Sequence, residues 1–138
     1  MIDVALLSTP LRLDACTDFV AHPSCGGLCF FVGNIRDRNL GEQVTHLEFD
    51  AYEAMAVKEM RKIAEAARQR FGLHAVALHH RKGRLEIGDT AVIVAVSSVH
   101  RAPAFRGCEY VIDALKESVP IWKKEFRADG SHWLNAHP

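Results

Sequence analysis

The sequence predicts an α+β fold in one domain, residues 1–138, with a mainly antiparallel sheet, two main helices and a C-terminal β-hairpin. Three observations lead to this prediction. A length of 138 residues with 49% hydrophobic composition suits one core. Along the chain, short apolar runs typical of strands alternate with three-four repeats typical of helices. No repeat, linker or low-complexity segment interrupts this order.

Two strands joined by a charged loop come first. Gly27 to Ile35 holds a continuous apolar run, which predicts a strand covered on both faces. The loop Arg36 to Glu42 follows, with Gly41 as its expected turn residue. Val44 to Phe49 then predicts a second strand. Two arginines therefore stand in a loop at the end of a strand.

The clearest helical pattern covers Ala51 to Phe71. Its apolar positions recur at three and four residues, and Gly72 stands where a left-handed residue would end the helix. A second helix is expected over Ala102 to Ser118, because apolar residues keep this spacing and Pro120 forbids continuation. Lys116 then falls in the last turn of that helix.

Further strands are predicted between and after the two helices. Ala75 to His79 and Thr90 to Ser97 have strand patterns, and the second is expected to be central. Turn-forming glycines join them around a short Arg84 to Ile87 segment. Beyond Pro120, a turn at 128–130 and a returning strand from Ser131 to Leu134 predict the hairpin.

Charge and composition exclude several function classes. Seventeen basic residues balance seventeen acidic ones, which argues against nucleic acid and membrane surfaces as partners. Any anion site must therefore be local. The first residues lack the basic segment and long apolar run of a signal peptide, and no segment has the roughly 20 apolar residues of a membrane span. A cytoplasmic protein is expected.

Neither a metal nor a resident cofactor is expected. The four cysteines lack the paired CxxC spacing of structural zinc sites and are expected to be reduced, mostly structural thiols: Cys16, Cys25, Cys29 and Cys108. The eight histidines are scattered. His79 and His80 are adjacent, so a strand would point them to opposite faces, where they could not easily share a metal.

Cations and apolar residues interleave between Val99 and Glu125. His100 and Arg101 stand between a strand and a helix start, where backbone N–H groups and the helix dipole favour an anion. Arg101 adds a fork suited to phosphate. Alternatively, Arg101 pairs with a surface acid while His100 only packs. Arg36 and Arg38 either join the same pocket or are solvated.

Two lysines flank the corner at 120–122. If the chain reverses there, Lys116 and Lys123 converge beside a proline and a tryptophan, where low dielectric and mutual repulsion lower a lysine pKa. A neutral lysine acts as a general base or as a nucleophile toward a carbonyl. The alternative is that Lys116 only complements a helix C-terminus and that Lys123 and Lys124 are exposed hairpin charges.

Motifs along most of the chain resemble the large subunit of molybdopterin synthase. The resemblance covers roughly residues 26 to 134, and the first 25 residues carry no motif of the family. It rests on five segments in order: FFVGNIRDRNLG at Phe30 to Gly41, LEFDAYEAMA at Leu47 to Ala56, HRKGRLEIGD at His80 to Asp89, SSVHRAPAF at Ser97 to Phe105 and DALKESVPIWKKE at Asp113 to Glu125.

The resemblance implies a hammerhead-like fold and a sulfur-transfer enzyme. In that family, a small ubiquitin-like subunit carries a C-terminal thiocarboxylate, and two such sulfurs convert cyclic pyranopterin monophosphate, precursor Z, into molybdopterin. The implied assembly is a homodimer of large subunits within a heterotetramer. By motif, Lys116 and Lys123 would be catalytic. Arg36, with His100 and Arg101 largely from the opposite protomer, would bind the pterin phosphate.

Two other functions stay open on the residues alone. A Schiff-base lyase would use Lys116 without a partner protein. A non-catalytic phosphate- or nucleotide-binding module is the other, in which Lys116→Ala would weaken binding without abolishing any turnover.

Overall fold

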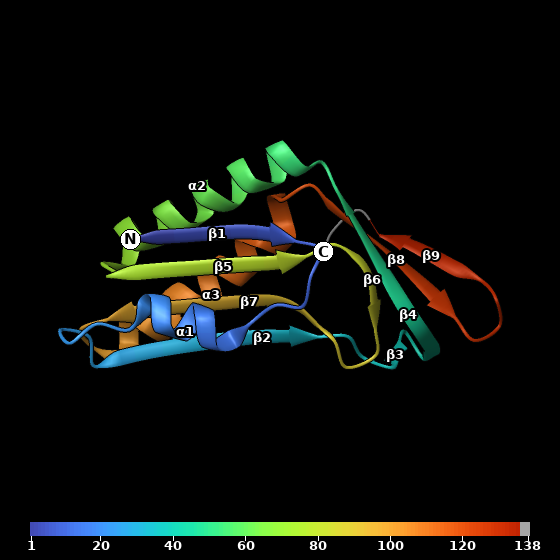
Figure 1. Cartoon of the computed structure of the whole chain (residues 1–138), viewed down its shortest axis with the longest axis horizontal. Helices are drawn as coiled ribbons and strands as arrows, with labels where there is room; N and C mark the ends of the chain where they lie inside the picture. Colours follow the sequence, from blue (N-terminus) through green and yellow to red (C-terminus); the bar gives the residue numbers. More distant parts are fainter. Residues whose placement is uncertain (136–138) are drawn as a thin grey trace.

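Two β-sheets lie side by side along the long axis of the molecule, and helices cover the first of them (Figure 1). The computed structural model describes residues 1–135. The elements are, in chain order, β1 (Ile2–Leu7), α1 (Leu13–Val20), β2 (Gly27–Asn34), β3 (Arg38–Asn39), β4 (Glu42–Ala51), α2 (Glu53–Phe71), β5 (Ala75–Arg81), β6 (Gly83–Glu86), β7 (Thr90–Ser98), α3 (Arg101–Ser118), β8 (Ile121–Arg127) and β9 (His132–Asn135).

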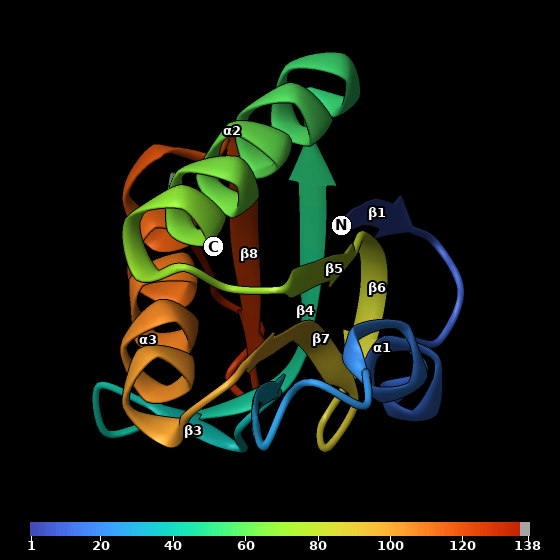
Figure 2. The same ribbon diagram turned by 90° about the vertical axis from the view of Figure 1, so that its left-hand side faces the viewer.

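The first sheet has the strand order β1-β5-β7-β2. β1 runs parallel to β5, and the other neighbours are antiparallel. β7 therefore has a partner on each side, as predicted. α2 and α3 cover one face of this sheet and α1 the other (Figure 2). Strand alternation divides the core accordingly, since Val94 and Val96 pack with the α2–α3 side while Ile93 and Ala95 pack with α1.

The second sheet contains β3, β4, β8 and β9 in that order, with β6 also paired to β4. β4 pairs antiparallel with β8 over most of its length, from Val44 opposite Arg127 to Ala51 opposite Ile121. β8 and β9 form the predicted C-terminal hairpin, and Gly130 in its turn has a φ of 88°. This glycine suits the left-handed conformation because it has no Cβ.

The two long helices follow the predicted ranges closely. α2 buries Met60, Ala64 and Ala67 and ends at Gly72, whose φ of 65° is the left-handed conformation expected of a helix cap. α3 ends one residue before Val119. Among residues 1–135, no helix is both long and apolar enough to cross a membrane.

Two predictions about the first sheet are incomplete or wrong. β1 and α1 lie in the first 25 residues, where the sequence patterns predicted no element. The prediction that β2 is covered on both faces is wrong, because Leu28, Phe30 and Val32 are exposed, Phe30 by 43%. β2 is an edge strand, and α1 packs mainly on β5 and β7. A continuous apolar run thus remains partly open to solvent.

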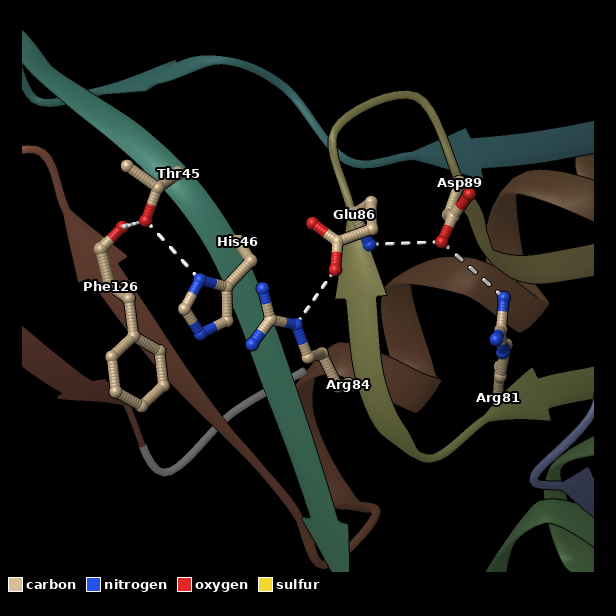
Figure 3. Close-up of polar contacts among 7 residues, drawn as sticks. All are labelled: Thr45, His46, Arg81, Arg84, Glu86, Asp89 and Phe126. Atoms are coloured by element: carbon tan, nitrogen blue, oxygen red, sulfur yellow. Dashed lines mark hydrogen bonds and ion pairs between the residues drawn. The ribbon is translucent and has the colours of Figure 1, made fainter.

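The chain crosses between the two sheets in the segment from β5 through β6 to β7, where polar contacts fix the turn (Figure 3). A carboxylate oxygen of Asp89 accepts the backbone N–H of Glu86 at 2.9 Å and lies 3.5 Å from the Arg81 guanidinium. The backbone of Ile35 exchanges two hydrogen bonds of 2.9 Å with Gly88 and Asp89. The start of the loop that carries Arg36 is therefore anchored.

Candidate active site

A pocket of about 150 Å³ lies where the two sheets meet, beside the last turn of α3. Both sheets contribute to its walls, with Phe31 from β2 and Phe49 from β4 among the apolar groups. Its charged groups are Arg36, Arg38, Lys116, Lys123 and Glu125. Four cations thus surround one carboxylate, which makes the pocket a local anion-attracting site in a chain of zero net charge.

The alternation of β8 separates neighbouring charged residues onto two faces. Lys123 and Glu125 lie opposite Phe49 and Leu47 of β4 and line the pocket. Lys124 lies on the other face, with its ammonium 5.1 Å from the centre of the Phe126 ring. Of the two adjacent lysines, only Lys123 can therefore act in the pocket.

Lys116 comes to the same pocket from the end of α3. Its pKa lies below the ordinary value of 10.5 because of partial burial, followed by the charges of Lys123 and Arg36, while Asp113 acts in the opposite direction. A lowered pKa increases the fraction of neutral amine available for proton transfer near neutral pH.

Glu125 belongs to the pocket, although the sequence did not single it out. The residue is 2% exposed, and its Oε1 accepts a hydrogen bond from Asn39 Nδ2 at 2.7 Å and lies 3.7 Å from Lys123 Nζ. Its Oε2 is buried and has no hydrogen-bond partner among the described residues. A carboxylate so placed can hold Lys123 in position. The one feature of the sequence that could have indicated Glu125 is its position two residues after Lys123, which places both side chains on the same face of a strand.

His80 lies behind the pocket as a neutral base. It is 2% exposed, and its Nδ1 contacts the Arg81 carbonyl oxygen at 2.8 Å. The pKa of His80 is lowered to about 4, mainly by burial; the hydrogen bond with the Arg81 carbonyl acts in the opposite direction, and the charge of Lys116 adds a smaller lowering effect. At neutral pH this histidine therefore adds no positive charge beside Lys116.

His100 and Arg101 do not reach this pocket. They precede and begin α3, whereas Lys116 lies fifteen residues later in the same helix. At 1.5 Å per residue, this separation is about 22 Å. Both residues are exposed, and among residues 1–135 Arg101 forms no ion pair, including with Glu109. One chain therefore holds the two predicted parts of the site at opposite ends of α3.

A second constellation has the residue types of a catalytic triad, but its cysteine is sealed from solvent. Cys16 Sγ lies 3.4 Å from His79 Nδ1, and His79 Nε2 lies 2.9 Å from Asp3 Oδ2. Cys16 is completely buried, and burial, followed by the charges of Asp3 and Asp14, raises the pKa of its thiol to about 11. A nucleophile must be a thiolate and accessible, so this group is structural.

The structure also bears on the predictions made for the other cysteines and for the adjacent histidines. All four cysteines are free thiols. Cys108 lies on the apolar face of α3, as predicted, where burial raises the pKa of its thiol to about 12. His79 and His80 contact different parts of the molecule, as predicted for adjacent strand residues.

Comparisons with known proteins agree with this architecture. The model of the family described as MoaE protein matches residues 6–118. A molybdopterin synthase catalytic subunit from Halalkalibacterium halodurans is 39% identical over 130 residues, which cover 94% of this chain and 83% of the relative. The crystal structure of molybdopterin synthase from Staphylococcus aureus superposes with a TM-score of 0.90 at 34% identity and covers 96% of each chain.

A third comparison concerns the fold alone. The complex of subunit 1 and 2 of molybdopterin-converting factor from Helicobacter pylori contains a chain that superposes with a TM-score of 0.79 at 23% identity, over 98% of this chain and 93% of that one. The superpositions confirm the predicted α+β fold. On the family match and the sequence identity of its relatives, this chain belongs to the MoaE protein family.

Proposed function

We propose that this chain is the catalytic subunit of a molybdopterin synthase, which transfers sulfur from a thiocarboxylated small subunit to cyclic pyranopterin monophosphate. The observation that carries the proposal is the convergence of Lys116 and Lys123 in a cationic pocket, with a lowered pKa at Lys116. Relatives of the chain are molybdopterin synthase catalytic subunits. Its free thiols are typical of a reducing compartment and support a cytoplasmic location.

The size of the pocket supports separate binding positions for the two substrates. A volume of about 150 Å³ is well below the roughly 300–1,000 Å³ of pockets that enclose whole small molecules. An extended glycine tail is narrow enough for such a space. We therefore assign the pocket to the C-terminal thiocarboxylate of the small subunit and its mouth, beside Arg36, to the pterin phosphate.

The two lysines suit the chemistry of this transfer. Their charges attract the thiocarboxylate anion and oppose negative charge that develops on its acyl oxygen. In its neutral form, Lys116 accepts a proton from the attacking group and returns it in a later step. Glu125 limits the repulsion around Lys123 by its charge at 3.7 Å. The sulfur comes from the small subunit, so no cysteine of this chain needs to react.

The pterin site requires a second copy of the chain in this proposal. β2 is an edge strand with an exposed apolar face, a structure that favours pairing with another strand. Its start lies against the backbone of His100 and Arg101, since a Cβ on Gly27 would be 2.7 Å from the His100 carbonyl oxygen. Its end, at Asn34, lines the lysine pocket.

Two-fold antiparallel pairing of β2 strands would bring the start of one strand beside the end of the other. His100 and Arg101 of one protomer would then approach the Lys116 pocket of its partner. Two such sites per dimer, each with its own small subunit, give the heterotetramer expected from the family resemblance.

The activity is tested with purified chain, thiocarboxylated small subunit and precursor Z, with molybdopterin as the measured product. The Lys116→Ala, Lys123→Ala double variant should be inactive while its circular dichroism spectrum stays unchanged. Full activity of this variant would refute the assigned roles.

Shared sites are tested by mixing inactive chains. Arg101→Ala and Lys116→Ala chains that exchange freely in equal amounts should recover about a quarter of the wild-type activity, because half of the dimers are hybrids with one intact site each. Each variant mixed with itself is the control. Absence of recovery after demonstrated exchange would contradict the shared site.

A lysine Schiff-base enzyme is the second candidate, because the lowered pKa of Lys116 also suits attack on a carbonyl. Borohydride reduction in the presence of the pterin substrate, without the small subunit, distinguishes the two functions. A covalent adduct on Lys116 under these conditions favours the Schiff-base reaction, whereas an unmodified lysine favours sulfur transfer.

A further inference from the structure

Three potential metal ligands converge at the end of the first sheet that lies away from the lysine pocket. His22 and Cys25 belong to the loop between α1 and β2, and His74 precedes β5 (Figure 1). One donor atom from each lies within 4.8 Å of the other two. Within residues 1–135, no other three His, Cys, Asp or Glu residues form such a group.

The loop presents two of these side chains from one turn. The backbone N–H of Cys25 donates to the carbonyl oxygen of His22 at 2.9 Å, which closes a four-residue turn with Pro23 in its second position. The resulting H-x₂-C spacing places two ligands on one turn, as the C-x₂₋₄-C pairs of structural zinc sites do. The next residue, Gly26, is tied to the Val99 carbonyl oxygen at 3.2 Å.

Ser24 can orient the imidazole of His22. Its hydroxyl oxygen lies 2.7 Å from His22 Nδ1, and its backbone N–H lies 3.1 Å from the same nitrogen. As it stands, Nδ1 accepts from the Ser24 backbone N–H; a metal on Nε2 requires the other tautomer, in which Nδ1–H donates to the Ser24 hydroxyl and the bond from the backbone N–H is lost. Metal-binding histidines usually donate their second ring N–H to an oxygen in this way.

The third ligand comes from a rigid position. The backbone N–H of His74 donates to the Ser97 carbonyl oxygen at 2.8 Å, and its own carbonyl oxygen accepts from the Met1 ammonium at 3.1 Å. The rings of His22 and His74 are 4.2 Å apart at 35°. Two imidazoles and a thiol from segments about fifty residues apart therefore meet at the surface.

We propose that His22, Cys25 and His74 bind one Zn²⁺ ion per chain. Two imidazoles and one thiolate suit Zn²⁺ and neighbouring transition metals, and disfavour Mg²⁺ and Ca²⁺, which select oxygen ligands. In a tetrahedral site the ligand atoms are roughly 3.5 Å apart, so a contraction of about 1 Å completes the site. His22 is exposed and can supply this movement by rotation. Water or another donor takes the fourth position.

The ion would have a structural role, because the site lies at the far end of the first sheet from Lys116. It would tie the loop before β2 to the start of β5, which are otherwise joined through β7. This proposal departs from the expectation of no metal. That expectation considered only cysteine spacing and adjacent histidines, whereas His74 is distant in sequence. The inference does not depend on the proposed sulfur transfer.

The test uses the full chain and Co²⁺ as a spectroscopic substitute for Zn²⁺. One equivalent of Co²⁺ should produce a thiolate charge-transfer band and tetrahedral ligand-field bands, and Zn²⁺ should displace it and raise the melting temperature. Cys25→Ser should abolish the charge-transfer band. It should also weaken Zn²⁺ binding by more than the roughly 10–100-fold typical of losing a supporting group.

Matched variants separate this site from chance binding. His22→Ala and His74→Ala should each weaken Zn²⁺ binding to a similar extent, whereas Cys29→Ser and His46→Ala, at other half-buried positions, should leave it unchanged. Circular dichroism checks that each variant is folded. No band with the wild-type chain, a band that persists in Cys25→Ser, or binding unaffected by both histidine variants would each overturn the proposal.

Discussion

The two ends of α3 differ in how completely one chain builds a site. At the C-terminal end, Lys116 faces a walled pocket in which Lys123 and the buried Glu125 are held by defined contacts. At the N-terminal end, His100 and Arg101 are exposed. In the proposed function, the reacting groups are therefore preorganised within one chain, whereas the anion-binding groups require a second protomer.

This difference indicates which groups the fold holds in fixed positions. A general base must be positioned closely and partly desolvated, and two sheets and a helix supply both conditions around Lys116. A phosphate-binding arginine acts over a longer range and tolerates an open position until an interface forms. The predictions below test each end separately, from the largest expected effect to the smallest.

Replacing Lys116, in the pocket at the C-terminal end of α3, should have the largest effect on activity. Lys116→Ala should lower the rate of molybdopterin formation by about 10²–10⁴-fold, the usual contribution of a general acid or base. Lys124→Ala is the matched control, because that lysine lies on the opposite face of β8. Equal losses in both variants would mean that surface charge, and not the pocket, matters.

A charged side chain on the exposed face of edge strand β2 should weaken the proposed dimer. Phe30→Asp should weaken dimerisation by roughly 100-fold or more, since each of two copies would bury a Phe side chain worth about 1.5–3 kcal/mol. Analytical ultracentrifugation measures this effect. Met55→Asp, an exposed position on α2, should leave the dimer intact. A wild-type chain that is monomeric at all concentrations would contradict the shared site.

Lowering the pH should reduce the free energy of unfolding through protonation of His80, which lies behind the lysine pocket. The pKa of this residue falls from 6.5 to about 4 on folding, so the unfolded chain binds one proton more between these values. The free energy of unfolding should therefore decrease as pH falls, by about 3 kcal/mol between pH 7 and pH 4 from this residue alone. Urea unfolding of the wild-type and His80→Phe chains measures the difference. Identical pH dependence would exclude His80 as the cause.

Adding a side-chain atom next to the backbone at the N-terminal end of α3 should have a smaller, local effect on stability and on substrate binding. Gly27→Ala would place a Cβ 2.7 Å from the His100 carbonyl oxygen, so the backbone of His100 and Arg101 must shift. We expect a loss of about 1–3 kcal/mol in unfolding free energy. The KM for the pterin should rise more than kcat falls. Gly26→Ala, whose nearest contact would be 3.1 Å, should be milder. Equal effects would argue against this reason.

Local patterns predicted the long elements well. The three-four spacing from Ala51 to Phe71 and the stop at Gly72 gave α2, and Pro120 marked the end of α3. β1 and α1 were missed; the eight residues of α1 make little more than two turns, too few for a clear three-four repeat. The exposure of β2 could not be predicted, because a continuous apolar run suits both a covered strand and an oligomer edge.

The site was predicted unevenly for a similar reason. Residue type and motif indicated Lys116, Lys123 and Arg36, and all three line one pocket. Glu125 was missed because its burial depends on the pairing of β8 with β4, more than seventy residues earlier. The cluster of His22, Cys25 and His74 was missed because only the folded sheet brings its parts together.

The pairing of β4 with β8 has a consequence for how the protein acquires its site during synthesis. Glu125 lies opposite Leu47, and Lys123 opposite Phe49, so the wall of the pocket joins an early and a late part of the chain. β1 with β5 and β2 with β7 likewise join distant segments. Such non-local contacts slow folding. The wall of the pocket therefore cannot form until β8 has been synthesised and can pair with β4.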